Sequence, residues 1–98
     1  MMVEVYSIDP TAVHDPIIQA IQRLHWIIEL DTPRVIIAAC DISFLSWGER
    51  ITIQVFPEGV FSEVMVESKS KAQLFDWGKN GRNERDFHQM LFFVLQGR

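Results

Sequence analysis

Two runs of alternating apolar and polar residues, separated by a short turn, constrain the fold of this chain more than any other feature. Residues 51–56 place an apolar side chain at every second position, and Val64 and Val66 alternate with Glu63, Met65 and Glu67 within residues 60–68. A period of two is typical of a strand with one buried face. Because Pro57-Glu58-Gly59 lies between the runs and is rich in turn-forming residues, the sequence predicts an antiparallel hairpin there.

Shorter signals predict three further strands. Residues 3–8 are β-prone and end at an Asp-Pro pair. Residues 25–30 and 34–40 flank the turn-like tripeptide Asp31-Thr32-Pro33, which indicates a second hairpin.

Two helices are expected, one after the first strand and one at the C-terminus. Asp9 or Asp15 can cap the first, since each precedes a proline, and the second start suits the core better. The last helix is expected to begin near Asn83 and to stop at Gly97. Apolar residues recur at helical spacing in both segments, at Ile17, Ile21, Leu24 and Ile28 and then at Phe87, Met90, Leu91, Val94 and Leu95. Of these, Ile28 is assigned to the strand that follows the first helix.

These elements sum to the order β-α-β-β-β-β-α. We therefore predict an α+β fold in which an antiparallel sheet of about five strands packs against two helices on one face. A chain of 98 residues fits one domain, so residues 1–98 are expected to form a single unit.

Charge and cysteine content narrow the class of partner and the compartment. Thirteen acidic and nine basic residues give a net charge of −4, which argues against binding to duplex nucleic acid. The single cysteine, Cys40, lies in a segment typical of a buried strand, so a reducing, cytoplasmic location fits best. No export signal is visible at the N-terminus, and no apolar run approaches the ~18 residues of a membrane span.

A ligand site is one interpretation of the two Trp-Gly connections. Lysine and arginine side chains near the last helix, with backbone N–H groups beside Gly78 and Gly81, suit an anion. The alternative is a glycine turn flanked by solvated lysines, with the tryptophans covering the ends of the sheet. The residues expected to form such a site are Trp47, Lys69, Trp77, Lys79 and Arg82.

Catalytic and metal-binding signatures are not found in the sequence. The spacings of His14, His25 and His88 do not match a zinc motif, and Cys40 has no Cys-x-x-Cys partner. The serines lie outside any Gly-x-Ser-x-Gly elbow. We therefore predict no catalytic residue, no metal and no cofactor.

Two motifs surround the Trp-Gly units of the chain. They consist of Ser46, Trp47, Gly48 and Glu49, and then of Ser68, Lys69, Gln73, Leu74, Asp76, Trp77, Gly78, Lys79 and Asn80. In these motifs the chain resembles an uncharacterised family of small bacterial domains. The resemblance implies a single α+β domain and no particular activity.

Two functions follow as hypotheses. The first is a non-enzymatic module that binds a protein partner or a copy of itself, motivated by an edge strand and by the apolar pair Phe92-Phe93. The alternative is a small-ligand or anion-binding domain that uses the Trp-Gly connections.

Overall fold

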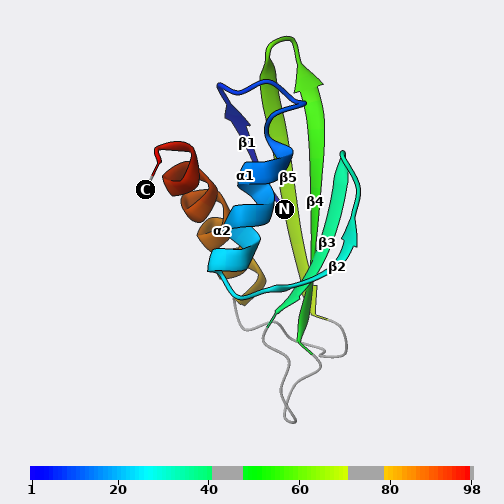
Figure 1. Ribbon diagram of the computed structural model, residues 1–98. Coiled ribbons are helices and arrows are strands. Elements are labelled where there is room, and N and C mark those ends of the chain that lie inside the picture. Colours follow the sequence, from blue (N-terminus) through cyan, green and yellow to red (C-terminus); the bar gives the residue numbers. More distant parts are fainter. Residues whose placement is uncertain (41–47, 71–78, 98) are drawn as a thin grey trace.

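The computed structural model describes residues 1–40, 48–70 and 79–97, and in these residues five strands and two helices form (Figure 1). The sheet has the order β1-β5-β4-β3-β2, and every neighbouring pair is antiparallel. The predicted α+β fold and element order are confirmed. The elements are β1 (Met2–Tyr6), α1 (His14–Arg23), β2 (Ile27–Asp31), β3 (Val35–Cys40), β4 (Glu49–Glu58), β5 (Phe61–Ser70) and α2 (Lys79–Leu95).

The two strands of the predicted central hairpin extend beyond the residues in which the alternation was found. Strands β4 and β5 pair over ten residues each, and Pro57 and Glu58 belong to β4 rather than to the turn. Gly59 adopts a φ of +63° at the turn itself, a conformation that favours glycine.

Both helices cover the same face of the sheet, as Figure 1 shows. Ile17 and Ile21 of α1 and Phe87 and Leu91 of α2 are fully buried in one cluster with the alternate residues of the strands. On that face, the strands contribute Ile36, Ala38, Cys40, Ile51, Ile53, Val55, Val64 and Val66 to the cluster. Neither described helix is long and apolar enough to cross a membrane.

The predicted starts of both helices were wrong. Helix α1 begins at His14 after Val13, and neither aspartate caps it, because Asp9 instead accepts hydrogen bonds from the backbone and hydroxyl of Thr11. Helix α2 begins at Lys79, four residues before Asn83, whose side chain is buried against the strands and is used there. The predicted stop at Gly97 fits the structure, since its φ is +76°.

Candidate functional site

The side of the sheet away from both helices, called here the open face, has no described element packed on it (Figure 1). Side chains alternate between the two faces of a strand, so the register assigns every second residue to this side. The open face consists of Val3 and Val5 from β1, Glu63, Met65, Glu67 and Lys69 from β5, Arg50, Thr52, Gln54 and Phe56 from β4, Val35, Ile37 and Ala39 from β3, and Ile27 and Leu30 from β2.

Most of the exposed apolar surface of the described residues gathers on this face. Of the nine large hydrophobic side chains that are exposed in the described part of the chain, five belong to the open face. Ile27 is 59% exposed and Val5 is 56% exposed, at opposite margins of the sheet. Val60 and Phe61 add two more at the adjoining hairpin tip. Apolar surface concentrated in this way is typical of an interaction site.

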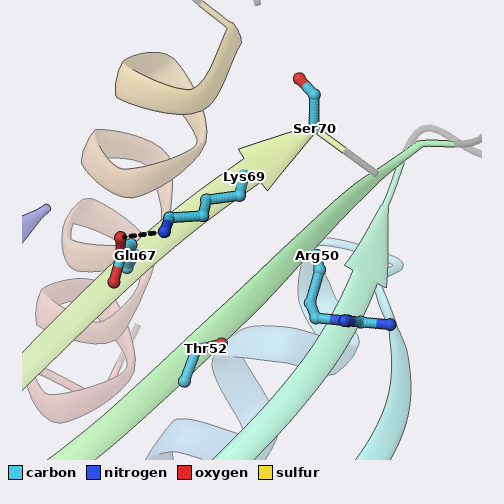
Figure 2. Close-up of a pocket in the computed structure, with 5 residues that line it drawn as sticks. All are labelled: Arg50, Thr52, Glu67, Lys69 and Ser70. Atoms are coloured by element: carbon cyan, nitrogen blue, oxygen red, sulfur yellow. Dashed lines mark ion pairs between the residues drawn. The ribbon is translucent and has the colours of Figure 1, made fainter. Parts of the chain in front are cut away.

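A hollow of about 370 Å³ lies at one end of the open face, as Figure 2 shows. Lys69 reaches along β5 to Glu67, and their Nζ and Oε1 atoms are 3.3 Å apart. Arg50 lies directly opposite Lys69 in the register and extends from β4 toward β3. Thr52 and Ser70 complete the lining. Two basic residues directly opposite each other on neighbouring strands are destabilising, so fold stability does not explain this pair.

The edges of the sheet are less accessible to a binding partner than its open face. On β1, the Met2 carbonyl accepts a hydrogen bond from His88 Nε2 at 3.0 Å, and the Tyr6 carbonyl accepts one from the backbone N–H of Ile8 at 2.8 Å. On β2, the register shifts between Ile28 and Leu30. Occupied backbone groups and bulges discourage the addition of another strand, so the edges are poor docking sites.

Three residues of the two motifs, Glu49, Ser68 and Asn80, join Cys40 and Asn83 in a largely buried polar cluster on the covered side of the sheet. The Ser68 hydroxyl donates to Asn80 Oδ1 at 2.8 Å and accepts from Asn83 Nδ2 at 3.2 Å. Asn83 Nδ2 also donates to Cys40 Sγ at 3.5 Å, and the Cys40 thiol lies 3.8 Å from Glu49 Oε2. These contacts join β3, β4 and β5 to the first turns of α2.

Glu84 extends this cluster toward the N-terminus. Its Oε2 accepts a hydrogen bond from the backbone N–H of Ser68 at 3.0 Å, and its Oε1 pairs with the Met1 ammonium at 3.0 Å. A buried carboxylate held in this way connects Met1 and β5 to α2, which is a structural role.

A second hollow, of about 520 Å³, lies between β1 and α2. His88 Nε2 donates to the Met2 carbonyl, so His88 Nδ1 is the acceptor for the Tyr6 hydroxyl, 2.6 Å away. Burial lowers the pKa of His88 and raises the pKa of Tyr6, which keeps both side chains neutral. Phe92 lines this hollow and is exposed, whereas Phe93 is half-buried.

A third hollow, of about 440 Å³, lies between the start of α1 and the turn after β2. His14 Nε2 is 2.5 Å from Asp31 Oδ1, and its Nδ1 is 3.4 Å from Asp15 Oδ1. The hydrogen bond to Asp31 is the main reason that the pKa of His14 is raised. A histidine that holds its proton between two carboxylates is a poor general base, and the neighbouring Thr11 hydroxyl donates to Asp9 instead.

Metal-binding geometry is not found in the described part of the chain. No group of three or more His, Cys, Asp or Glu side chains there is placed to hold a metal ion. His14, His25 and His88 all lie in the described part of the chain and belong to no such group.

The predicted ligand-binding residues are divided between several places. Trp47 and Trp77 lie outside the described residues, as does the side chain of Lys79, whose backbone begins α2. Lys69 belongs to the open face, whereas Arg82 is exposed on α2, on the other side of the sheet. The binding role of these five residues therefore stays a prediction.

Sequence reasoning missed Arg50, although a signal for it was available. The hairpin register counted back from the turn pairs Glu58 with Phe61 and Arg50 with Lys69. Once the turn is placed at Gly59, that count alone brings the two basic residues together.

Comparison with known proteins adds no identification. No family model matches the chain, and no curated protein matches it. The resemblance to small bacterial domains remains a prediction.

Proposed function

We propose that this chain is a non-enzymatic protein-interaction module that self-associates through the open face of its sheet. The observation that carries the proposal is the concentration of exposed apolar side chains on that face, with Ile27 and Leu30 on β2 and Val3 and Val5 on β1. Burying such side chains contributes about 25 cal/mol per Å² of apolar surface, which favours association.

The charges on the open face favour a second copy as the partner. The two central strands place two basic residues, Arg50 and Lys69, and two acidic residues, Glu63 and Glu67, on this face. A face for nucleic acid is uniformly basic, whereas a face with equal numbers of both signs is able to complement itself.

The mass of the purified protein across a concentration series tests the proposal. We expect the mass to rise from 11.4 kDa toward twice that value in light scattering. The double variant Ile27→Thr/Leu30→Thr should stay at the monomer mass, since threonine keeps β-propensity but removes apolar area. The matched control is Phe92→Thr on α2, which is also exposed and apolar.

Two outcomes would oppose this function. One is a wild-type protein that stays at 11.4 kDa at every concentration. The other is a dimer that Phe92→Thr dissociates and the β2 double variant leaves intact, which would place the interface on α2.

A second candidate function is binding of an oxyanion in the hollow of Figure 2, and the cross-strand pair of Arg50 and Lys69 favours it. An anion between the two side chains would relieve their repulsion, and the hydroxyl of Thr52 is a donor beside it. Inorganic phosphate at fixed ionic strength should then raise the melting temperature. The rise should disappear in Arg50→Gln and persist in Arg82→Gln; an equal response of both variants would exclude this site.

The same proposal includes a cytoplasmic location. Cys40 is buried in β3, where its sulfur accepts a hydrogen bond from Asn83. A buried, reduced cysteine fits a reducing compartment. Fractionation of cells that express the protein, with blotting of each fraction, tests the location, and recovery outside the cytoplasm would contradict it.

A further inference from the structure

We infer that two copies stack with their open faces together and their strands antiparallel, so that Lys69 of one copy lies over Glu63 of the other. This inference rests on the proposed self-association and adds its geometry and the residues that determine its specificity. Arg50 of one copy then lies over Phe56 of the other.

The open face is ordered in four rows that run across the strands. The register pairs Lys69 with Arg50 in the first row and Glu67 with Thr52 in the second. Met65 pairs with Gln54 in the third row, and Glu63 pairs with Phe56 in the fourth. The basic residues therefore occupy the end of the face that Figure 2 shows. The register places the acidic and the aromatic residue at the other end.

A two-fold axis that crosses the strands between the second and third rows superimposes opposite ends of the two faces. Lys69 then meets Glu63, an ion pair that is desolvated by the contact, and Arg50 meets the ring of Phe56, a cation–π contact. Both contacts occur twice, because the axis makes the interface self-complementary.

Next to the axis, Thr52 faces Gln54 of the second copy, so polar side chains meet there. On β5, Glu67 faces Met65 of the second copy, and the ion pair of Glu67 with Lys69 of its own chain offsets part of the charge that is buried there. On β3, which the register places beside β4, Ile37 faces Val35 of the second copy. Stacked sheets of this kind align their strands within about 30° and lie about 10 Å apart.

The alternative two-fold axis, which runs along the strands, brings like charges together. An axis over β4 places Arg50 against Arg50 of the second copy, and an axis between β4 and β5 places Arg50 against Lys69. Like-charge contacts across an interface cost several kcal/mol in unfavourable cases, roughly enough to reject an orientation. The charge pattern therefore favours the axis across the strands.

The size of the face predicts a dimer of modest affinity. Five strands about 4.8 Å apart, over about seven residues of about 3.3 Å each, present roughly 500 Å² per copy. The pair buries roughly 1,000 Å², near the lower limit of stable interfaces. The dimer should therefore dissociate on dilution within an accessible concentration range.

Charge reversal with a mixing step tests the register. In a dimer of Lys69→Glu, two carboxylates face each other at both copies of this contact, and in a dimer of Glu63→Lys two ammonium groups do so. Each variant alone should weaken self-association by at least roughly tenfold in sedimentation velocity, which corresponds to about 1.4 kcal/mol. An equimolar mixture should regain the dimer mass, because each of the two contacts in the mixed pair joins a carboxylate to an ammonium group.

Matched controls separate this effect from net charge and from folding. Arg82→Glu and Asp86→Lys make charge changes of the same kind on exposed positions of α2 and should leave the dimer unchanged. Circular dichroism of each variant confirms that the fold is retained.

The outcomes distinguish the register from the proposed function. If wild type dimerises and Ile27→Thr/Leu30→Thr does not, but the mixture of charge variants fails to recover the dimer, the register is wrong and the function stands. If the α2 controls weaken the dimer equally, the register is also wrong. If wild type remains monomeric throughout, the register and the proposed self-association fall together.

Discussion

The two faces of the sheet carry different residues, and packing within the monomer explains only the residues of the covered face. On the covered face, alternate side chains such as Ile51 and Ile53 are fully buried beneath α1 and α2. On the open face, the intervening positions hold exposed apolar residues and the facing basic pair of Arg50 and Lys69. Burial accounts for the first set and also for Ala39 and Met65 of the open face, whereas the exposed residues of the open face contribute little to the stability of the monomer and therefore point to a contact outside it.

The largest expected difference between the faces appears when an aromatic ring is removed from each. Phe87 is fully buried, and its ring stacks on Trp26 with centroids 6.3 Å apart, whereas Phe56 is 45% exposed. Phe87→Ala should lower the free energy of unfolding by about 3–5 kcal/mol because it leaves a cavity. Phe56→Ala should cost the monomer less than about 1 kcal/mol. Urea unfolding at a concentration where the protein is monomeric measures both.

Equal losses for these two variants would contradict the comparison. They would mean that the open face is packed against part of the same chain. The slope of the urea transition serves as a check, since a change in it would indicate altered compactness rather than a lost contact.

The polar end of the covered face gives the next largest effect. Asn83→Ala removes the donors to the Ser68 hydroxyl and the Cys40 thiol, both of which are buried. Leaving buried polar atoms without those bonds should cost about 1–3 kcal/mol in urea unfolding. Gln22→Ala, on the exposed side of α1, is the control and should be nearly neutral. A neutral Asn83→Ala would show that the cluster does not stabilise α2.

These two effects also show how far the sequence predicts the structure. Period-two alternation identified the central hairpin, and helical spacing identified the cores of both helices, because burial imposes those periods directly. The predicted helix starts were wrong because a side chain that can cap a helix can also make a tertiary hydrogen bond instead. Asn83 is of this kind, and its side chain donates to Ser68 on β5. Local pattern does not contain that contact.

The end of α1 illustrates the same limit. The backbone N–H of Trp26 bonds to the carbonyl of Ile21, and His25 adopts a φ of +61°, a conformation usually left to glycine. Because this position holds histidine rather than glycine, the sequence shows no clear signal for the end of α1. The strand that corresponds to β2 was therefore predicted to begin two residues too early. For the site, Lys69 was identified but Arg50 was not, since their proximity follows from strand register rather than from a motif.

The pH dependence of stability provides a smaller effect at the margin of the covered face. Burial lowers the pKa of His88 against the opposing influence of the Met2 carbonyl and of Glu4 and Glu84. Because the unfolded chain then binds a proton more readily, the stability from neutral His88 is present above a pH of about 6.5 and is lost as the pH falls through the folded pKa. His88→Gln should flatten this fall in a series of urea titrations between about pH 7.5 and about pH 5.0, which spans the ordinary histidine pKa.

The contribution of His14 to stability is expected to change with pH in the direction opposite to that of His88. Its pKa is raised, chiefly by the hydrogen bond to Asp31, so its contribution is present below the ordinary pKa and is lost as the pH rises through the folded value. His14→Gln should therefore flatten the loss of stability on the alkaline side. Because His14 is partly exposed, its effect should be smaller than that of His88. Identical pH profiles for both variants would refute the assigned environments.

The smallest expected effect tests whether the open face is built for the stability of the monomer. Arg50 and Lys69 are directly opposite each other, and Glu67 compensates only Lys69, at 3.3 Å. Arg50→Gln should therefore raise the free energy of unfolding of the monomer by a few tenths of a kcal/mol, roughly the size of a cross-strand pair, and salt should reduce the gain. Thr52→Gln, on the same strand and face, controls for the glutamine side chain. A clear loss of stability in Arg50→Gln would assign Arg50 to the fold, whereas a gain would mean that this residue is retained at a cost to the monomer, as expected of a residue that acts in an interface.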